Sequence, residues 1–168
     1  MFCVNDTVMY GNSGVCTIVD IRPEKFGKEE IMYYILKPVY QDKSTIYCPV
    51  NSNKLKIRKL LTKQEAYDLI RIMPNTEAEW VENDHQRKER FTKILKDGDQ
   101  QDLVKLIKTL YFMREEKAKE GKKPHAVDER IMKEAEGLLY EELAYVLHIK
   151  PNEVVPFIVG GLESEARL

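Results

Sequence analysis

Cysteine is scarce in the chain and is not spaced for a metal site or a disulfide framework. The three cysteines, Cys3, Cys16 and Cys48, are odd in number, lie far apart and form no C-x-x-C pair. Zinc sites and disulfide-rich folds depend on closely repeated cysteines. We therefore expect buried, free thiols in a reducing compartment, because unpaired cysteine is among the residue types most often buried.

The chain also lacks a long uninterrupted hydrophobic run. The longest such stretch, Val154–Leu162, includes two glycines, and it is far shorter than the roughly 20 apolar residues of a transmembrane helix. The first residues, Met1–Asp6, contain no basic region followed by an apolar segment, as a secretory signal would. We expect no contact with a membrane and a cytoplasmic location.

Catalytic and phosphate-binding patterns are missing as well. Gly11 and Gly14 belong to a hairpin-like turn, not to a loop between a strand and a helix. His85, His125 and His148 lie on separate predicted elements without metal-ligand spacing. The carboxylates lie among lysines on predicted helix faces, where i,i+4 ion pairs are the ordinary explanation. The sequence therefore predicts neither an enzyme nor a bound cofactor.

A strong net charge is absent too, although the charge is uneven. The formal net charge is −1, with nine Lys/Arg against six Asp/Glu in residues 1–60 and 18 against 22 in residues 61–168. This balance excludes a polybasic DNA-coating protein but leaves room for a local basic patch.

Two kinds of periodicity divide the chain. Residues 1–60 read as short strands joined by turns, with predicted strands at Thr7–Tyr10, Val15–Ile21, Ile31–Leu36 and Ser44–Val50 and turns at Gly11–Gly14, Arg22–Glu30 and Gln41–Lys43. Strands at this spacing indicate a small all-β barrel or sandwich. Sixty residues are marginal for independent stability, so we expect this module to pack against the rest of the chain.

From residue 61 onward the pattern is helical. Thr62–Glu65 and Thr76–Glu79 each read as a capping box, which predicts one helix from Ala66 to Ile72 and another from Trp80 to Lys96. Asp97–Gly98 ends the second helix, and Asp99 and Asp128 are predicted to cap the third and fourth helices, with a short final helix near Pro151. We expect an α+β fold of two domains, an all-β barrel over residues 1–60 and an all-α domain of about five helices over residues 61–168.

The single tryptophan, Trp80, lies beside unusual neighbours. Nine polar residues separate Val81 from the next apolar residue, Phe91. On a helix, position 80 shares a face with Arg87 and with the apolar residues Phe91 and Leu95. That pattern predicts a helix that docks by its carboxyl-terminal half while its amino-terminal half projects.

Trp80 has two possible interpretations. An exposed indole beside Arg87, Lys88 and Arg90 suits nucleic acid, because an aromatic ring can wedge at a base step while cations hold phosphates. Alternatively, Trp80 packs back on the first helix or the β-module as a structural staple, because aromatic side chains are usually buried in part. The burial of the indole distinguishes the two.

Three stretches resemble the CarD/CdnL family of bacterial transcription regulators. The first is Val4–Tyr10 with Gly14-Val15, similar to an opening V-G-D-x-V-x-Y strand with G-V after it. The second is Thr45–Val50, similar to the last strand of the family's β-module. The third, Trp80–Leu110, looks like the family's tryptophan helix, its break before a Gly-Asp pair and the next helix. The resemblance covers nearly the whole chain.

Some positions depart from the family pattern. Asn5 stands where Gly is usual, Gly11 where Pro is usual and Cys16 where Gly is usual. Trp80 lies about one helical turn further from the Asp97–Asp99 break than in some members, which moves it by about 5–6 Å along a helix axis.

The resemblance implies a Tudor-like N-terminal module that binds the β subunit of bacterial RNA polymerase, with contacts near Lys25 and Tyr47. It also implies a helical domain that reaches promoter DNA at the upstream edge of the melted bubble. There Trp80 would be the wedge that stabilises the open complex, and Arg87, Lys88 and Arg90 the phosphate contacts. From the residues alone, Lys25 is equally a solvated loop lysine and Tyr47 an aromatic of the barrel face.

Tethering by polymerase would explain the near-neutral charge. A protein delivered to DNA by a partner needs little phosphate affinity of its own, so we expect a monomer that binds free duplex DNA weakly. The alternative is a protein-interaction adaptor with a Tudor/SH3-like module and no contact with nucleic acid.

Overall fold

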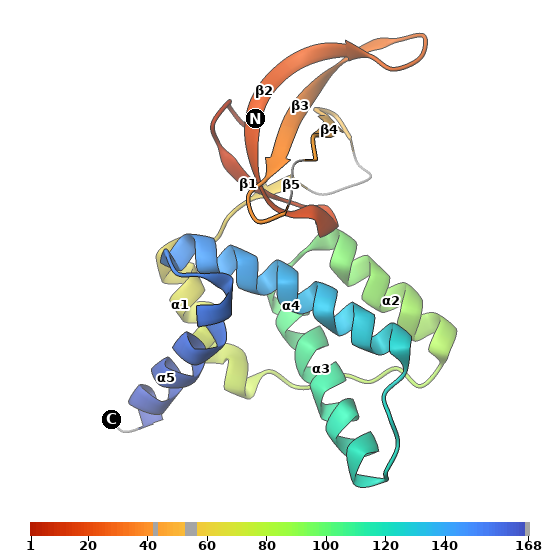
Figure 1. The fold of residues 1–168 in the computed structure, drawn as a ribbon, viewed down its shortest axis with the longest axis vertical. Helices are drawn as coiled ribbons and strands as arrows, with labels where there is room; N and C mark the ends of the chain where they lie inside the picture. The colour runs from red at the N-terminus through yellow and green to blue at the C-terminus, as the bar shows by residue number, and fades with distance from the viewer. Residues whose placement is uncertain (42–43, 53–56, 167–168) are drawn as a thin grey trace.

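A five-stranded antiparallel sheet forms the N-terminal part of the molecule (Figure 1). The computed structural model describes residues 1–41, 44–52 and 57–166. The strands are β1 (Thr7–Tyr10), β2 (Gly14–Lys25), β3 (Glu30–Pro38), β4 (Ile46–Pro49) and β5 (Ile57–Lys59). Their order is β4-β3-β2-β1-β5, so β4 and β5 lie at opposite edges and the sheet is open. The predicted closed barrel is not found in this part of the chain.

The β2–β3 hairpin is longer than predicted. Strand β2 continues through Pro23 to Lys25, where the sequence predicted a loop from Arg22 to Glu30. A register shift between Ile18 and Asp20 bends this hairpin, which extends away from the helices in Figure 1. The predicted turn at Gln41–Lys43 lies partly outside the described residues.

Five α-helices come after the sheet. They are α1 (Lys63–Ile72), α2 (Asp84–Asp97), α3 (Gln100–Lys119), α4 (Ala126–Leu147) and α5 (Val154–Ala166), with short 3-10 turns at Gly11–Ser13, Met73–Asn75 and Pro151–Glu153. Three predicted boundary signals are confirmed. Thr62 and Glu65 form a capping box at α1, Gly98 ends α2 in a left-handed conformation, and Asp99 caps α3.

Two predicted helix starts are wrong. Helix α2 begins at Asp84 and is capped by Asn83, so Trp80 precedes the helix. Neither residue makes the predicted cap, because the Thr76 hydroxyl donates back to the Ile72 carbonyl and the Glu79 carboxylate is held by side chains of α2 and α3. Helix α4 begins at Ala126, so Asp128 lies in its first turn and does not cap it.

Two hydrophobic cores hold the fold together. The smaller one lies within the sheet and includes Val8, Ile18 and Leu36. The larger one is helical, but Met9 of β1 and Val15 of β2 belong to it, so it crosses from the sheet into the helices. Because apolar packing is continuous across this junction, the sheet rests directly on the helical part, as its small size predicted.

A buried ion pair reinforces the junction. Glu142 of α4 is fully buried, and its two carboxylate oxygens accept hydrogen bonds of 2.8 and 2.7 Å from Arg58 of β5. Arg58 also donates to the carbonyl of Gly98 at the end of α2, and the backbone N–H of Leu61 donates to Glu142. One arginine thus joins the sheet to two helices by charge-assisted hydrogen bonds.

The cysteines match the prediction only in part. All three are free, and Cys16 and Cys48 are buried in the smaller core, where burial raises the pKa of the Cys16 thiol to about 12. Cys3 is exposed, which contradicts the predicted burial. In the described part of the chain, no helix is long and apolar enough to cross a bilayer.

Candidate interaction surfaces

The outer end of the β2–β3 hairpin carries an aromatic cluster in which the exposed Phe26 and Tyr47 contact the buried Tyr33. Their rings meet edge to face, with centroids 5.2 to 6.3 Å apart. Phe26 is 59% exposed and Tyr47, on the edge strand β4, is 39% exposed. Lys25 precedes Phe26 and is exposed, so both residues predicted to bind a protein partner lie at this end of the sheet. Exposed aromatic rings beside a cation are typical of protein-binding surfaces.

Trp80 lies in a segment without helix or strand, between residues 76 and 83, which we call the tryptophan segment. Its indole is partly buried against the larger core. It is therefore neither freely projecting nor enclosed, and the predicted register of Trp80 on the α2 helix does not exist. The sequence predicted that helical turns separate Trp80 from Gly98. That count of turns does not apply, because the residues before Asp84 are not helical.

Glu79 anchors the tryptophan segment to two helices. Its backbone N–H donates to the Thr109 hydroxyl of α3 at 2.9 Å. Its carboxylate pairs with Lys105 of α3 at 2.5 Å and with Arg90 of α2 at 2.6 Å. Hydrogen bonds from Lys105 and then Arg90 lower the pKa of Glu79. Arg90, a predicted phosphate contact, therefore has a carboxylate partner within the chain.

Arg87 is buried, although the sequence predicted a projecting amino-terminal half of the helix. Its side chain is only 7% exposed, and its guanidinium carbon lies 4.3 Å from the centre of the Trp80 ring. The guanidinium also pairs with Asp84 and Asp128. The structure thus brings Trp80 and Arg87 together as a stacked pair, with Arg87 buried and Trp80 partly exposed, and it does not bring Lys88 into that group.

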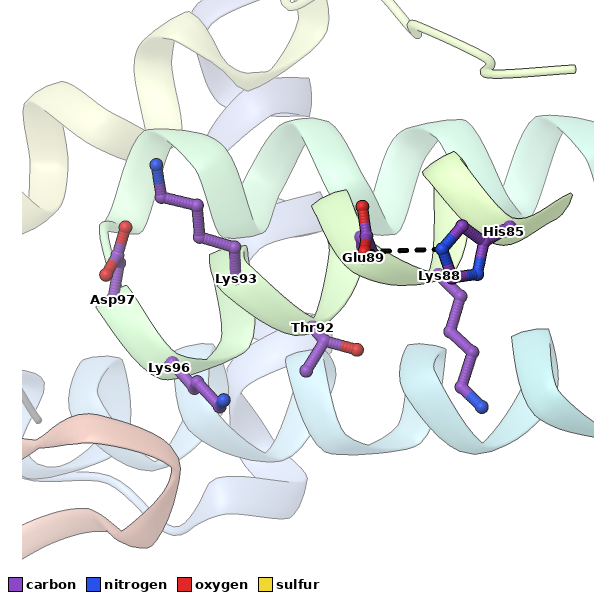
Figure 2. A pocket seen from close by; sticks show the side chains of 7 residues that line it. All are labelled: His85, Lys88, Glu89, Thr92, Lys93, Lys96 and Asp97. Atoms are coloured by element: carbon purple, nitrogen blue, oxygen red, sulfur yellow. Dashed lines mark ion pairs between the residues drawn. The ribbon is translucent and has the colours of Figure 1, made fainter. Parts of the chain in front are cut away.

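The outer face of α2 carries an open hollow with several cations. It is lined by His85, Lys88, Glu89, Thr92, Lys93, Lys96 and Asp97 (Figure 2). His85 and Glu89 pair at 3.4 Å, while Lys88, Lys93 and Lys96 are exposed. Sequence reasoning identified Lys88 but missed the other two lysines. Their spacing of three to five residues along one helix was the signal that could have found them.

A second, apolar hollow of about 990 Å³ lies between α3, α4 and α5. Tyr111, Phe112, Val155 and Val159 line it and are about half exposed. No predicted site residue belongs to it. Among the described residues, no three His, Cys, Asp or Glu side chains gather as a metal site would require.

Comparison with known protein families finds a match for the residues that form the sheet. A family model described as the CarD-like/TRCF RID domain matches residues 2–61. The match covers all five strands and the aromatic cluster. A comparison with curated proteins gives no match. The matched family is one of interaction domains that bind RNA polymerase, not of catalytic domains, which supports a role in transcription. The match over residues 2–61 therefore confirms, for the sheet, the resemblance to the CarD-like family that the sequence predicted.

Proposed function

We propose that this protein binds the β subunit of bacterial RNA polymerase through the outer end of its sheet and stabilises the promoter open complex through Trp80. The observation that carries the proposal is the family match over residues 2–61, whose sheet exposes Lys25, Phe26 and Tyr47 at one end. The end of the β2–β3 hairpin extends away from the helices in Figure 1, so a partner can reach it without displacing the helical core.

The helical part supplies the contact with DNA. Trp80 is partly exposed at the edge of the larger core, and its indole can reach a base step at the upstream edge of a melted bubble. Lys88, with Lys93 and Lys96, forms a row of exposed cations on the outer face of α2 that suits phosphates. The row is short and has acidic neighbours, which fits weak binding to free duplex DNA and dependence on tethering by polymerase.

Arg87 and Arg90 support the competing proposal, an adaptor that never meets nucleic acid. Both arginines are paired with carboxylates of the same chain, so each would have to leave its partner to reach a phosphate. The partial burial of Trp80 points the same way. Their role as phosphate contacts stays a prediction, and the stability of open complexes decides between the two functions.

The test is the lifetime of open complexes formed by the cognate polymerase with the protein or its variants. Trp80→Ala is expected to shorten the lifetime while polymerase binding persists. Tyr67→Ala is the control, because Tyr67 is a 38% exposed aromatic on α1 outside both proposed surfaces. An unchanged lifetime for Trp80→Ala, with polymerase binding intact, would leave the adaptor function.

Polymerase binding has its own comparison. Tyr47→Ala and Tyr67→Ala remove tyrosines of nearly equal exposure, 39% and 38%, from the sheet edge and from α1. Only Tyr47→Ala is expected to weaken binding to the β subunit. Equal effects would argue against the hairpin end as the contact.

Tight binding of the protein to free duplex DNA at physiological salt, with a steep salt dependence, would argue against tethering.

A further inference from the structure

Arg87 has more partners within the chain than a residue kept for an external phosphate would have. Its Nη1 donates to the backbone carbonyls of Val81 at 3.0 Å and Glu82 at 3.4 Å. Its Nη2 lies 2.7 Å from the Asp84 carboxylate, and its Nε lies 3.7 Å from that of Asp128. Two of these partners are main-chain atoms of the tryptophan segment itself.

The guanidinium plane also covers one face of the indole. The distance of 4.3 Å from its central carbon to the Trp80 ring centre is that of a close cation–π stack. Arginine can stack its flat face on a ring while its edge donates hydrogen bonds, which a lysine ammonium cannot do. Arg87 therefore contacts both the indole and the backbone just after it.

Asp128 ties this arrangement to the helical core. Its side chain is 12% exposed and lies in the first turn of α4, whereas Asp84 is 84% exposed and contributes little through screened charge. Helix α4 contributes buried residues to the larger core and to the junction with the sheet. Through Asp128, the position of Arg87 is tied to a helix that packs in the larger core.

We infer that Arg87 is a positioning residue for Trp80: anchored by Asp128, it fixes the tryptophan segment and holds the indole in one orientation. Without Arg87, residues 80–83 lose the donor to two of their carbonyls and the indole loses the group that covers one face. The segment would then have to become ordered when DNA binds, and the conformational entropy lost in that step would weaken the contact. This consequence rests on the proposed function, but the positioning itself is a property of the free protein.

The single tryptophan makes the inference measurable without any partner. In free protein, Arg87→Lys and Asp128→Asn are expected to shift Trp80 emission to longer wavelength, lower its anisotropy and raise its quenching by acrylamide. Arg87→Gln is expected to do so more strongly. Arg87→Lys and Asp128→Asn each have a matched control. Arg130→Lys makes the same change at an exposed arginine of α4, and Glu129→Gln removes a first-turn carboxylate of α4 that does not contact Arg87.

The two controls separate positioning from a general loss of stability. Asp128→Asn and its control Glu129→Gln each remove a negative charge that stabilises the amino-terminal end of α4. Any loss of stability from that cause is therefore the same in both variants. If emission and quenching match the parent in Arg87→Lys and Asp128→Asn, or change equally in all four matched variants, the inference is overturned. Should Arg87→Gln fail to fold, the two milder variants still decide.

A second readout connects the position of Trp80 to function. Arg87→Lys is expected to shorten the open-complex lifetime about two- to fivefold, the factor that corresponds to a cation–π pair at a partly exposed site. If Trp80→Ala leaves the lifetime unchanged, the proposed function fails while the fluorescence result still stands. If Trp80→Ala shortens the lifetime but Arg87→Lys changes neither fluorescence nor lifetime, the positioning role fails and the proposed function survives.

Discussion

Two arginines, the partly exposed Arg58 and the buried Arg87, fasten two different regions of this molecule, and they do so in different ways. At the junction, Arg58 joins a strand, the end of α2 and a fully buried carboxylate of α4. At the tryptophan segment, Arg87 holds a stretch without regular secondary structure against a single ring and a carboxylate that is partly exposed. Loss of Arg58 should therefore destabilise the whole chain, whereas loss of Arg87 should free one local segment.

The largest effect is expected from breaking the junction. Arg58→Ala leaves Glu142 buried without its charged partner and should lower the free energy of unfolding by about 3–5 kcal/mol. Urea denaturation followed by circular dichroism measures it. The control is Arg22→Ala, which removes an exposed arginine paired with Asp20 and Glu24 and should change the stability little, because solvent screens such pairs. Equal losses in the two variants would contradict the junction's role.

A smaller loss of stability is expected from replacing Gly14, which lies at the same junction. Gly14 starts β2 with φ of 80° and ψ of −148°, a conformation nearly restricted to glycine, and a Cβ there would lie 2.6 Å from a carboxylate oxygen of Glu141. That carboxylate can move aside, but the backbone strain remains, so Gly14→Ala should cost about 1–3 kcal/mol.

Gly137→Ala is the matched control for Gly14→Ala. It lies within α4, and a Cβ there meets no atom within 4 Å, so alanine should stabilise the chain by about 0.5–1 kcal/mol. Thermal denaturation of the two variants should therefore shift in opposite directions. A shift in the same direction for both would show that the conformation of Gly14 does not matter.

The smallest effect is expected from protonating the Glu79 carboxylate, which anchors the tryptophan segment. Lys105 and Arg90 lower the pKa of Glu79, so their ion pairs stabilise the folded segment at neutral pH. That contribution fades as the pH falls from the usual carboxyl pKa through the lowered one. Trp80 emission should change in this acid range, and the change should be smaller in Glu79→Gln. Identical pH profiles for the parent and this variant would show that Glu79 does not anchor the segment.

Local signals in the sequence were sufficient for much of the fold. The capping box at Thr62, the glycine at position 98 and the turn between the first two strands depend on neighbours along the chain, and the structure has all of them. Even a departure from the family pattern has a local explanation. Asn5 adopts a φ of 75°, the left-handed conformation that asparagine tolerates best after glycine, so the turn survives the replacement.

The tryptophan segment was not predictable in this way, because contacts distant in sequence decide it. A capping box at Thr76–Glu79 was a reasonable local interpretation, but Glu79 pairs instead with Lys105 of α3. Arg87 pairs with Asp128, which lies 41 residues further along the chain. The position of Arg87 on its own helix therefore did not predict that its side chain is buried. Strand β5 was missed for a similar reason, since three residues carry too little periodicity.

Photo-crosslinking from position 80 would show whether Trp80 touches promoter DNA, on which the proposed function depends. A photoreactive residue at position 80, with one at position 67 as the control, would be added to open complexes of the cognate polymerase. We expect a crosslink from position 80 to DNA at the upstream edge of the bubble and none from position 67. Crosslinks from position 80 to polymerase alone, with binding intact, would contradict the proposed contact.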